Sequence, residues 1–144
     1  MTRRSRAREV ALQLLFQFDL NAAVERGVQE RFVHERLGDA EAERFCLRLV
    51  DGVQAKRAEI DRTLSDVAEN WRLPRMPAVD RNVLRLGAYE LLHMPETPAT
   101  AVINEAIELA RRFGSKDSPA FVNGLLDRIA RQRGSESPTP AEGA

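Results

Sequence analysis

The chain has 144 residues, 43% of them hydrophobic, which is enough for one domain or for two small halves that share a core. Its 22 basic and 22 acidic residues give a net charge of zero, so a nucleic-acid site would require an uneven distribution of charge. The single cysteine, Cys46, excludes an intrachain disulfide, and no apolar run is long enough to span a membrane. Because the N-terminus also lacks a signal-peptide pattern, we expect a cytoplasmic protein.

Helical periodicity dominates the first half of the chain. A short second helix within Val28–Leu37 ends at Gly38. Asp39 can cap a third helix, which is predicted from about residue 40 towards residue 70 with a bend at Gly52. The first helix of the chain, which precedes these two, has apolar residues at the spacing of a buried stripe, namely Ala7, Val10, Ala11, Leu14, Leu15 and Phe18.

The second half begins after a connection, WRLPRMP at 71–77, whose two prolines prevent a helix from continuing. The next helix, at about Val79–Met94, is apolar over most of its circumference and is therefore predicted to be central and buried. Two further helices follow, the first of which ends at Gly114. Each is predicted to start with a capping residue and a proline, at Thr97–Pro98 and at Ser118–Pro119.

These patterns predict an all-α fold in one helical domain, residues 1–133, with halves of about 1–73 and 74–133. The polar, proline-rich segment 134–144 is expected to be a disordered tail. Cys46 lies in an apolar helical pattern, which favours a buried core residue over a nucleophile.

Little in the sequence indicates an enzyme. His34 and His93 are far apart and lack the spacing of paired metal ligands, and no phosphate-binding loop, dinucleotide fingerprint or nucleophile motif is present. The carboxylates occupy positions that exposed helix faces favour. We therefore expect neither catalytic residues nor a bound metal or cofactor.

The first eight residues contain four arginines and no acid: Arg3, Arg4, Arg6 and Arg8. Arginine binds phosphate through its planar fork and stacks on bases. The cluster therefore fits an RNA-binding segment, and it fits a solubilising terminus equally well.

Two phenylalanines also suggest RNA. Phe16 points away from the first helix's stripe, so it fits either a base-stacking ring or a second packing interface. Phe121 follows Asp117 at the start of the last helix, where free N–H groups suit a phosphate. The alternative is that the Phe121 ring merely closes the helix entrance.

Three stretches of the chain carry a resemblance to a known family: RSRAREVALQLLFQFD, VDRNVLRLGAYELL and VINEAIELARRFGSKDSPAFVNGLLDRIAR. Over residues 3–132 the chain resembles the NusB family, and the long last stretch is highly specific. The resemblance implies a fold of two packed helical bundles. It also implies a transcription antitermination factor that binds boxA of ribosomal RNA leader transcripts. The implied partners are the ribosomal protein NusE, other Nus factors and RNA polymerase.

The resemblance also implies RNA-contact positions wherever its motifs align: Arg3, Arg4, Arg6, Arg8, Phe16, Asp80, Arg85, Asp117 and Phe121. Relatives often have tyrosine at the position of Phe16, and some carry polar or basic residues at Pro119 and Ala120. Those differences remove one possible hydrogen bond and one possible phosphate contact.

Two alternatives to a standalone RNA-binding factor remain at the level of sequence. NusB-like domains also occur on ribosomal RNA cytosine methyltransferases, but this chain leaves no room for a cofactor-binding domain. The other alternative is a protein-interaction module, in which a homodimer masks the RNA surface.

Overall fold

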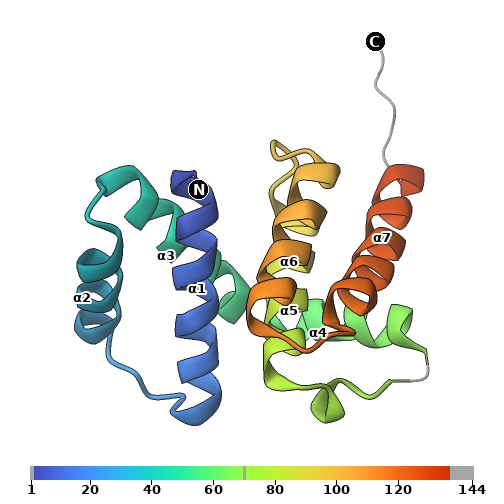
Figure 1. Cartoon of the computed structure of the whole chain (residues 1–144), viewed down its shortest axis with the longest axis horizontal. Coiled ribbons are helices and arrows are strands. Elements are labelled where there is room, and N and C mark those ends of the chain that lie inside the picture. The colour runs from blue at the N-terminus through green and yellow to red at the C-terminus, as the bar shows by residue number, and fades with distance from the viewer. Residues whose placement is uncertain (1, 70, 137–144) are drawn as a thin grey trace.

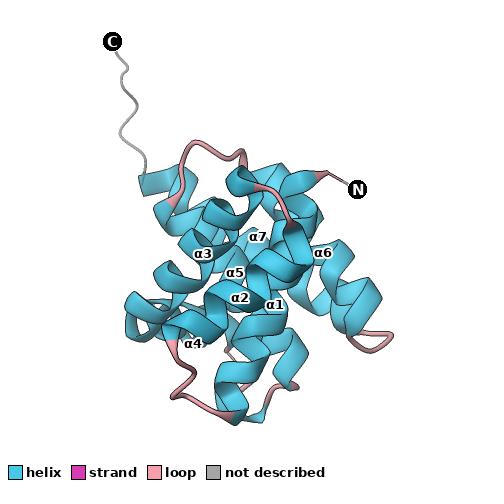
Figure 2. Cartoon of the chain, turned by 90° about the vertical axis from the view of Figure 1, so that its left-hand side faces the viewer, coloured by secondary structure: helices cyan, strands magenta, loops and turns pink. Residues whose placement is uncertain are grey.

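The computed structural model describes residues 2–69 and 71–136, which form seven α-helices, one 3₁₀ turn and no strand (Figures 1 and 2). The predicted all-α class is confirmed. In chain order the elements are α1 (Arg3–Leu20), α2 (Arg26–Leu37), α3 (Ala40–Ala55), α4 (Arg57–Ala68), the turn η1 (Leu73–Arg75), α5 (Ala78–His93), α6 (Ala99–Phe113) and α7 (Ser118–Glu136).

The helices form two bundles, with α1 to α3 on one side of the molecule and α4 to α7 on the other (Figure 1). In the first bundle α1 packs against α2 and α3, and in the second α6 packs against α5 and α7. Helix α4 packs against α5 and α7 and so groups with the second bundle. The bundles therefore change at Lys56, whereas the sequence placed the boundary of the halves near residue 73.

Helix α5 is the hub of the fold, as its apolar sequence predicted. It contacts α1, α3, α4, α6 and α7, so neighbours surround it on every side. From Asn82 to Leu91 every residue is buried. The same helix buries charged groups, and each has a partner on another helix, because an unpaired buried charge would be strongly destabilising.

Several predicted helix ends are confirmed, and two predicted caps are wrong. Gly38 ends α2 in the left-handed region, at φ 60°, and the Asp39 carboxylate accepts a hydrogen bond from the Ala42 N–H at 2.9 Å. Thr97 does not cap α6, because Pro98 occupies the N-cap position. Ser118 is already the first residue of α7, and its hydroxyl bonds elsewhere.

The predicted third helix is in fact two helices, because the chain breaks at Lys56. Gly52 is not the bend. It lies inside α3 beneath Tyr89, and a Cβ atom there would lie 2.1 Å from Cζ of that ring. The glycine therefore serves close packing between α3 and α5.

Two further expectations concern the core and the tail. Cys46 is fully buried, and burial, aided by the charge of Asp51, raises the pKa of its thiol to about 12, as suits an inert core residue. Helix α7 continues to Glu136, three residues into the segment expected to be disordered, and residues 137–144 lie outside the described part. None of the described helices is long and apolar enough to cross a membrane.

Candidate nucleic-acid interface

Three of the four N-terminal arginines are exposed on the first turn of α1. Thr2 caps this helix by accepting a hydrogen bond from the Ser5 N–H at 3.0 Å. Arg3 lies 3.8 Å from its nearest carboxylate oxygen, and Arg6 lies 3.4 Å from its nearest carboxylate oxygen. The Arg4 guanidinium lies over the Phe45 ring, 4.2 Å from the ring centroid. The ion pairs of Arg3 are solvent-accessible and contribute little. All three arginines are exposed, so they remain accessible to a phosphate.

Arg8 differs, because it is buried and paired inside the protein. Its guanidinium donates two hydrogen bonds of 2.7 Å to the Glu90 carboxylate of α5. Burial alone would lower the pKa of Arg8, but the hydrogen bonds and charge of Glu90 and the charge of Glu105 outweigh it and raise the pKa. Arg8 therefore fits neither the RNA-binding segment nor the solubilising terminus that the sequence suggested for all four arginines.

Asp80 and Arg85 are also interior residues that hold helices onto α5. Asp80 accepts a 2.6 Å hydrogen bond from the Ser118 hydroxyl, which in turn accepts one from the Ser115 N–H at 2.9 Å. Arg85 donates to both oxygens of Asp61 in α4, at 2.9 and 3.1 Å. Asp80 thereby fixes the α6–α7 connection, residues 114–117, which carries Asp117 on the surface.

Phe16 lies in a shallow groove between the two bundles. Phe16 is 39% exposed, so its ring reaches the surface and is not buried in the core. The groove has a volume of about 460 Å³. Its aromatic and charged lining comes from α1, α2 and α6: Phe16, Phe32, Arg36 and Phe113. The Arg36 guanidinium lies 3.5 Å from the centroid of the Phe32 ring, so a cation and several rings meet here.

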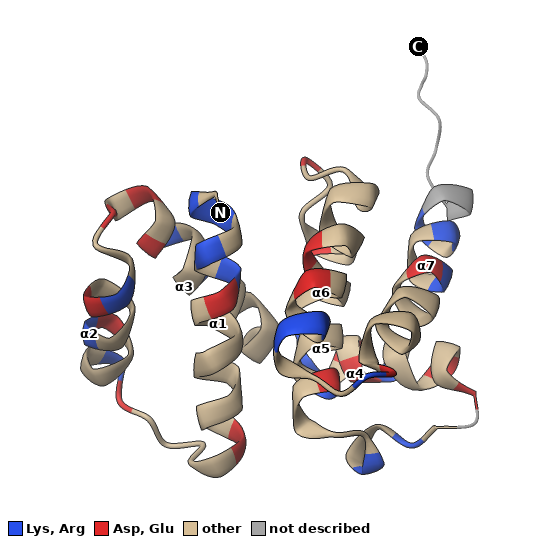
Figure 3. Ribbon diagram, viewed as in Figure 1, with Lys and Arg blue, Asp and Glu red and all other residues tan. Residues whose placement is uncertain are grey.

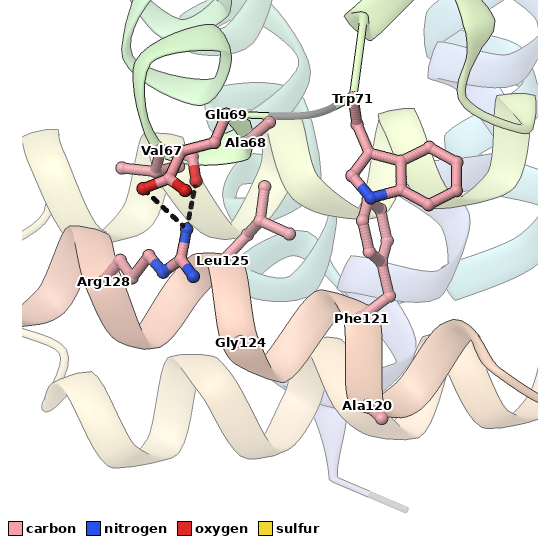
Figure 4. Close-up of a pocket in the computed structure, with 9 residues that line it drawn as sticks. All are labelled: Val67, Ala68, Glu69, Trp71, Ala120, Phe121, Gly124, Leu125 and Arg128. Atoms are coloured by element: carbon pink, nitrogen blue, oxygen red, sulfur yellow. Dashed lines mark hydrogen bonds and ion pairs between the residues drawn. The ribbon is translucent and has the colours of Figure 1, made fainter.

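Phe121 lies in a second groove, between α7 and the end of α4 (Figure 4). Its half-buried ring meets the Trp71 ring edge-on, with centroids 5.5 Å apart. Phe113, before the α6–α7 connection, lines the first groove and Phe121, after it, lines the second, so along the chain the connection lies between the two grooves.

The C-terminal end of α6 and the connection after it add basic residues that the sequence analysis did not single out. Figure 3 shows basic residues at the start of α1 and at the C-terminal end of α6. Arg112 bonds Glu9 of α1 at 3.1 Å, which fixes the end of α6 beside α1, and Arg111 and Lys116 are exposed. The run ARRFGSK was visible in the sequence, but only the fold places it beside Phe16.

The structure therefore divides the nine predicted site residues. Arg8, Asp80 and Arg85 are interior and hold helices together. The others reach the surface: Arg3, Arg4, Arg6, Phe16, Asp117 and Phe121. In the described ranges no group of three or more His, Cys, Asp or Glu residues is placed to hold a metal ion. Exposed cations beside partly exposed rings can bind phosphate and stack unpaired bases.

Comparison with known proteins agrees with this architecture along almost the whole chain. A family model described as the NusB family matches residues 5–131. The transcription antitermination protein NusB of Sorangium cellulosum is 46% identical over 134 residues, covering 93% of this chain and 96% of the relative. Its counterpart from Myxococcus xanthus is 45% identical over 134 residues, covering 90% and 96%.

Solved structures agree as well. NusB of T. maritima superposes with a TM-score of 0.80 at 38% identity, covering 92% of each chain. A chain from a crystal structure of antitermination factors NusB and NusE in complex with double-stranded RNA gives 0.82 at 26% identity, covering 92% and 98%. Both the sequence motifs and the helix arrangement are shared over nearly the full length. The chain belongs to the NusB family.

Proposed function

We propose that the protein is an RNA-binding transcription antitermination factor. It binds boxA of ribosomal RNA leader transcripts together with the ribosomal protein NusE. With other Nus factors, the pair helps RNA polymerase to read through terminators. The relatives' name as antitermination proteins supports this role, and a related NusB chain has been solved with NusE and RNA.

The observation that carries the proposal is the surface around the α6–α7 connection. Along the chain this connection lies between Phe113, which lines the groove of Phe16, and Phe121, which lines the second groove, and exposed arginines lie at the start of α1 and the end of α6. Phosphate contacts from the arginines would give affinity, while the rings would select unpaired bases. The net charge of zero makes this local arrangement the main source of electrostatic attraction.

The test compares a boxA RNA with a scrambled RNA of the same composition, with and without NusE, over a series of salt concentrations. Fluorescence anisotropy of end-labelled RNA measures the affinity. We expect weak binding by the protein alone and tighter binding with NusE, because two joined surfaces then share one RNA. Equal affinity for the two RNAs in the presence of NusE would rule out boxA recognition.

One observation favours a second candidate function, a homodimer that masks the RNA surface. Leu20 and Val28 are unusually exposed for apolar side chains, at 78% and 43%. They line a groove of about 520 Å³ that shares Gln17 with the groove of Phe16. Self-association there would cover Phe16. Sedimentation equilibrium with and without RNA separates the candidates, because a masking dimer would dissociate as RNA binds, and Leu20→Glu should abolish it.

A further inference from the structure

Trp71, the chain's only tryptophan, is unusually exposed. Its surface is 56% accessible, although large aromatic side chains are mostly buried in proteins of this size. The ring is nevertheless not isolated, because it packs edge-on against Phe121 with 67° between the two ring planes. Exposure together with a fixed aromatic neighbour suits a ring that stacks on a ligand.

The groove beside this aromatic pair is open and has room for a planar group. It measures about 240 Å³ and runs between the end of α4 and the first half of α7 (Figure 4). Gly124 forms part of its wall, and nothing lies within 4 Å of the place where a Cβ would be. Arg128 borders it, held by a 2.6 Å hydrogen bond to the Val67 carbonyl and a 3.7 Å ion pair with Glu69.

The residues that follow Trp71 supply positive charge without an internal partner. Arg72 and Arg75 are exposed, and in the part of the chain that the structure describes neither lies within 4 Å of a carboxylate. Many other arginines are paired, as Arg26 is with Asp51. Free cations beside an exposed ring match the two needs of a single-stranded nucleic acid, neutralised phosphates and stacked bases.

We infer that Trp71 is a second base-stacking position, which extends the RNA site from Phe121 along the connection between α4 and α5. An unpaired base stacks on the Trp71 ring beside the base held at Phe121, and Arg72 and Arg75 bind the phosphates of this part of the strand. This inference rests on the proposed RNA-binding function. Continuity with the Phe121 groove and the unpaired cations favour RNA over a protein as the occupant.

Because Trp71 is the only tryptophan, its fluorescence reports on this position alone. The full-length protein is titrated at low salt with a single-stranded boxA RNA, and anisotropy of end-labelled RNA is recorded in parallel with tryptophan emission. We expect quenching that saturates at the same RNA concentration as the anisotropy. Trp71→Ala should weaken binding about five-fold or more, and Trp71→Phe should retain most of the affinity. Replacing Arg72 and Arg75 by Gln should lower the salt slope by about 0.7 for each lost contact.

The outcomes separate this inference from the proposed function. RNA binding without quenching, with Trp71→Ala equal to wild type, would overturn the inference and leave the proposed function standing. No RNA binding by the wild-type protein would overturn both. If Trp71→Ala and Trp71→Phe keep RNA affinity and only Trp71→Ala loses NusE, the position belongs to a protein interface and the inference fails. Thermal denaturation of each variant confirms that it folds.

Discussion

At the scale of single residues, burial decides which predicted site residues can meet a ligand. Arg8 and Arg3 have the same side chain and lie five residues apart, yet the Arg8 side chain is 7% exposed and the Arg3 side chain is 71% exposed. The sequence showed four equivalent arginines. It could not show that Glu90, far along the chain, lies opposite Arg8, because that contact depends on how α5 packs against α1.

Replacing Arg8 by methionine should destabilise the protein by roughly 3–5 kcal/mol, because it leaves the Glu90 carboxylate buried without its partner. The double variant Arg8→Met/Glu90→Leu should recover most of that loss, since neither charge then remains unpaired. Urea denaturation measures the free energy of unfolding of both variants. A single variant as stable as wild type would contradict the structural role of the Arg8–Glu90 pair.

Phe121 is the residue on which the stacking hypothesis depends most. Phe121→Ala should weaken RNA binding by about 1–3 kcal/mol, the range for a lost stacked base. Its ring is only half-buried, so the loss of stability should stay below the roughly 3–5 kcal/mol of a fully buried phenylalanine. Phe18→Ala, at a buried position of α1, is the matched control and should show that larger loss. Wild-type RNA affinity in Phe121→Ala would remove the residue from the site.

At the scale of elements, local signals predicted helix ends where the cause is local. Gly38 with Asp39 ends one helix and starts the next through backbone conformation and a capping hydrogen bond. The break at Lys56 has no such signal, because the apolar stripe continues from α3 into α4 without a glycine or proline at the break. It follows from packing, since α3 lies against α1 and α5 whereas α4 lies against α5 and α7.

Gly52 provides a test of packing against intrinsic helix propensity. Alanine in a helix interior is favoured over glycine by about 1 kcal/mol. At Gly52, however, the new Cβ would lie 2.1 Å from Tyr89, so Gly52→Ala should be net destabilising by about 1–3 kcal/mol. Gly124→Ala in α7 meets nothing within 4 Å and should be stabilising. Thermal denaturation compares the two, and stabilisation by both would show that Tyr89 moves aside freely.

At the scale of the whole molecule, buried polar pairs on α5 connect the interior to the surface site. Glu90 holds α1, Arg85 holds α4 and Asp80 holds the start of α7. The basic N-terminus, the end of α6 and Phe121 are therefore presented by helices that pack on one central helix. The family motifs contain interior residues that hold helices together as well as surface residues. The sequence therefore indicated a candidate site but could not separate these two kinds of residue.

The last prediction concerns where the charge of this neutral molecule lies. Replacing Arg3, Arg4 and Arg6 by alanine changes the net charge from 0 to −3 and should leave the melting temperature almost unchanged, because all three are exposed. Each lost phosphate contact should lower the slope of log affinity against log salt by about 0.7, so the slope should fall by up to about 2.

A control variant with the same net charge replaces arginines on α3, α4 and the end of α7, namely Arg44, Arg62 and Arg131, all exposed. If net charge alone governed binding, both triple variants would lose the same slope. If the arginines at the start of α1 contact phosphates directly, only the N-terminal variant should show a smaller slope of log affinity against log salt. An unchanged slope in the N-terminal variant would mean that these three arginines only keep the protein soluble.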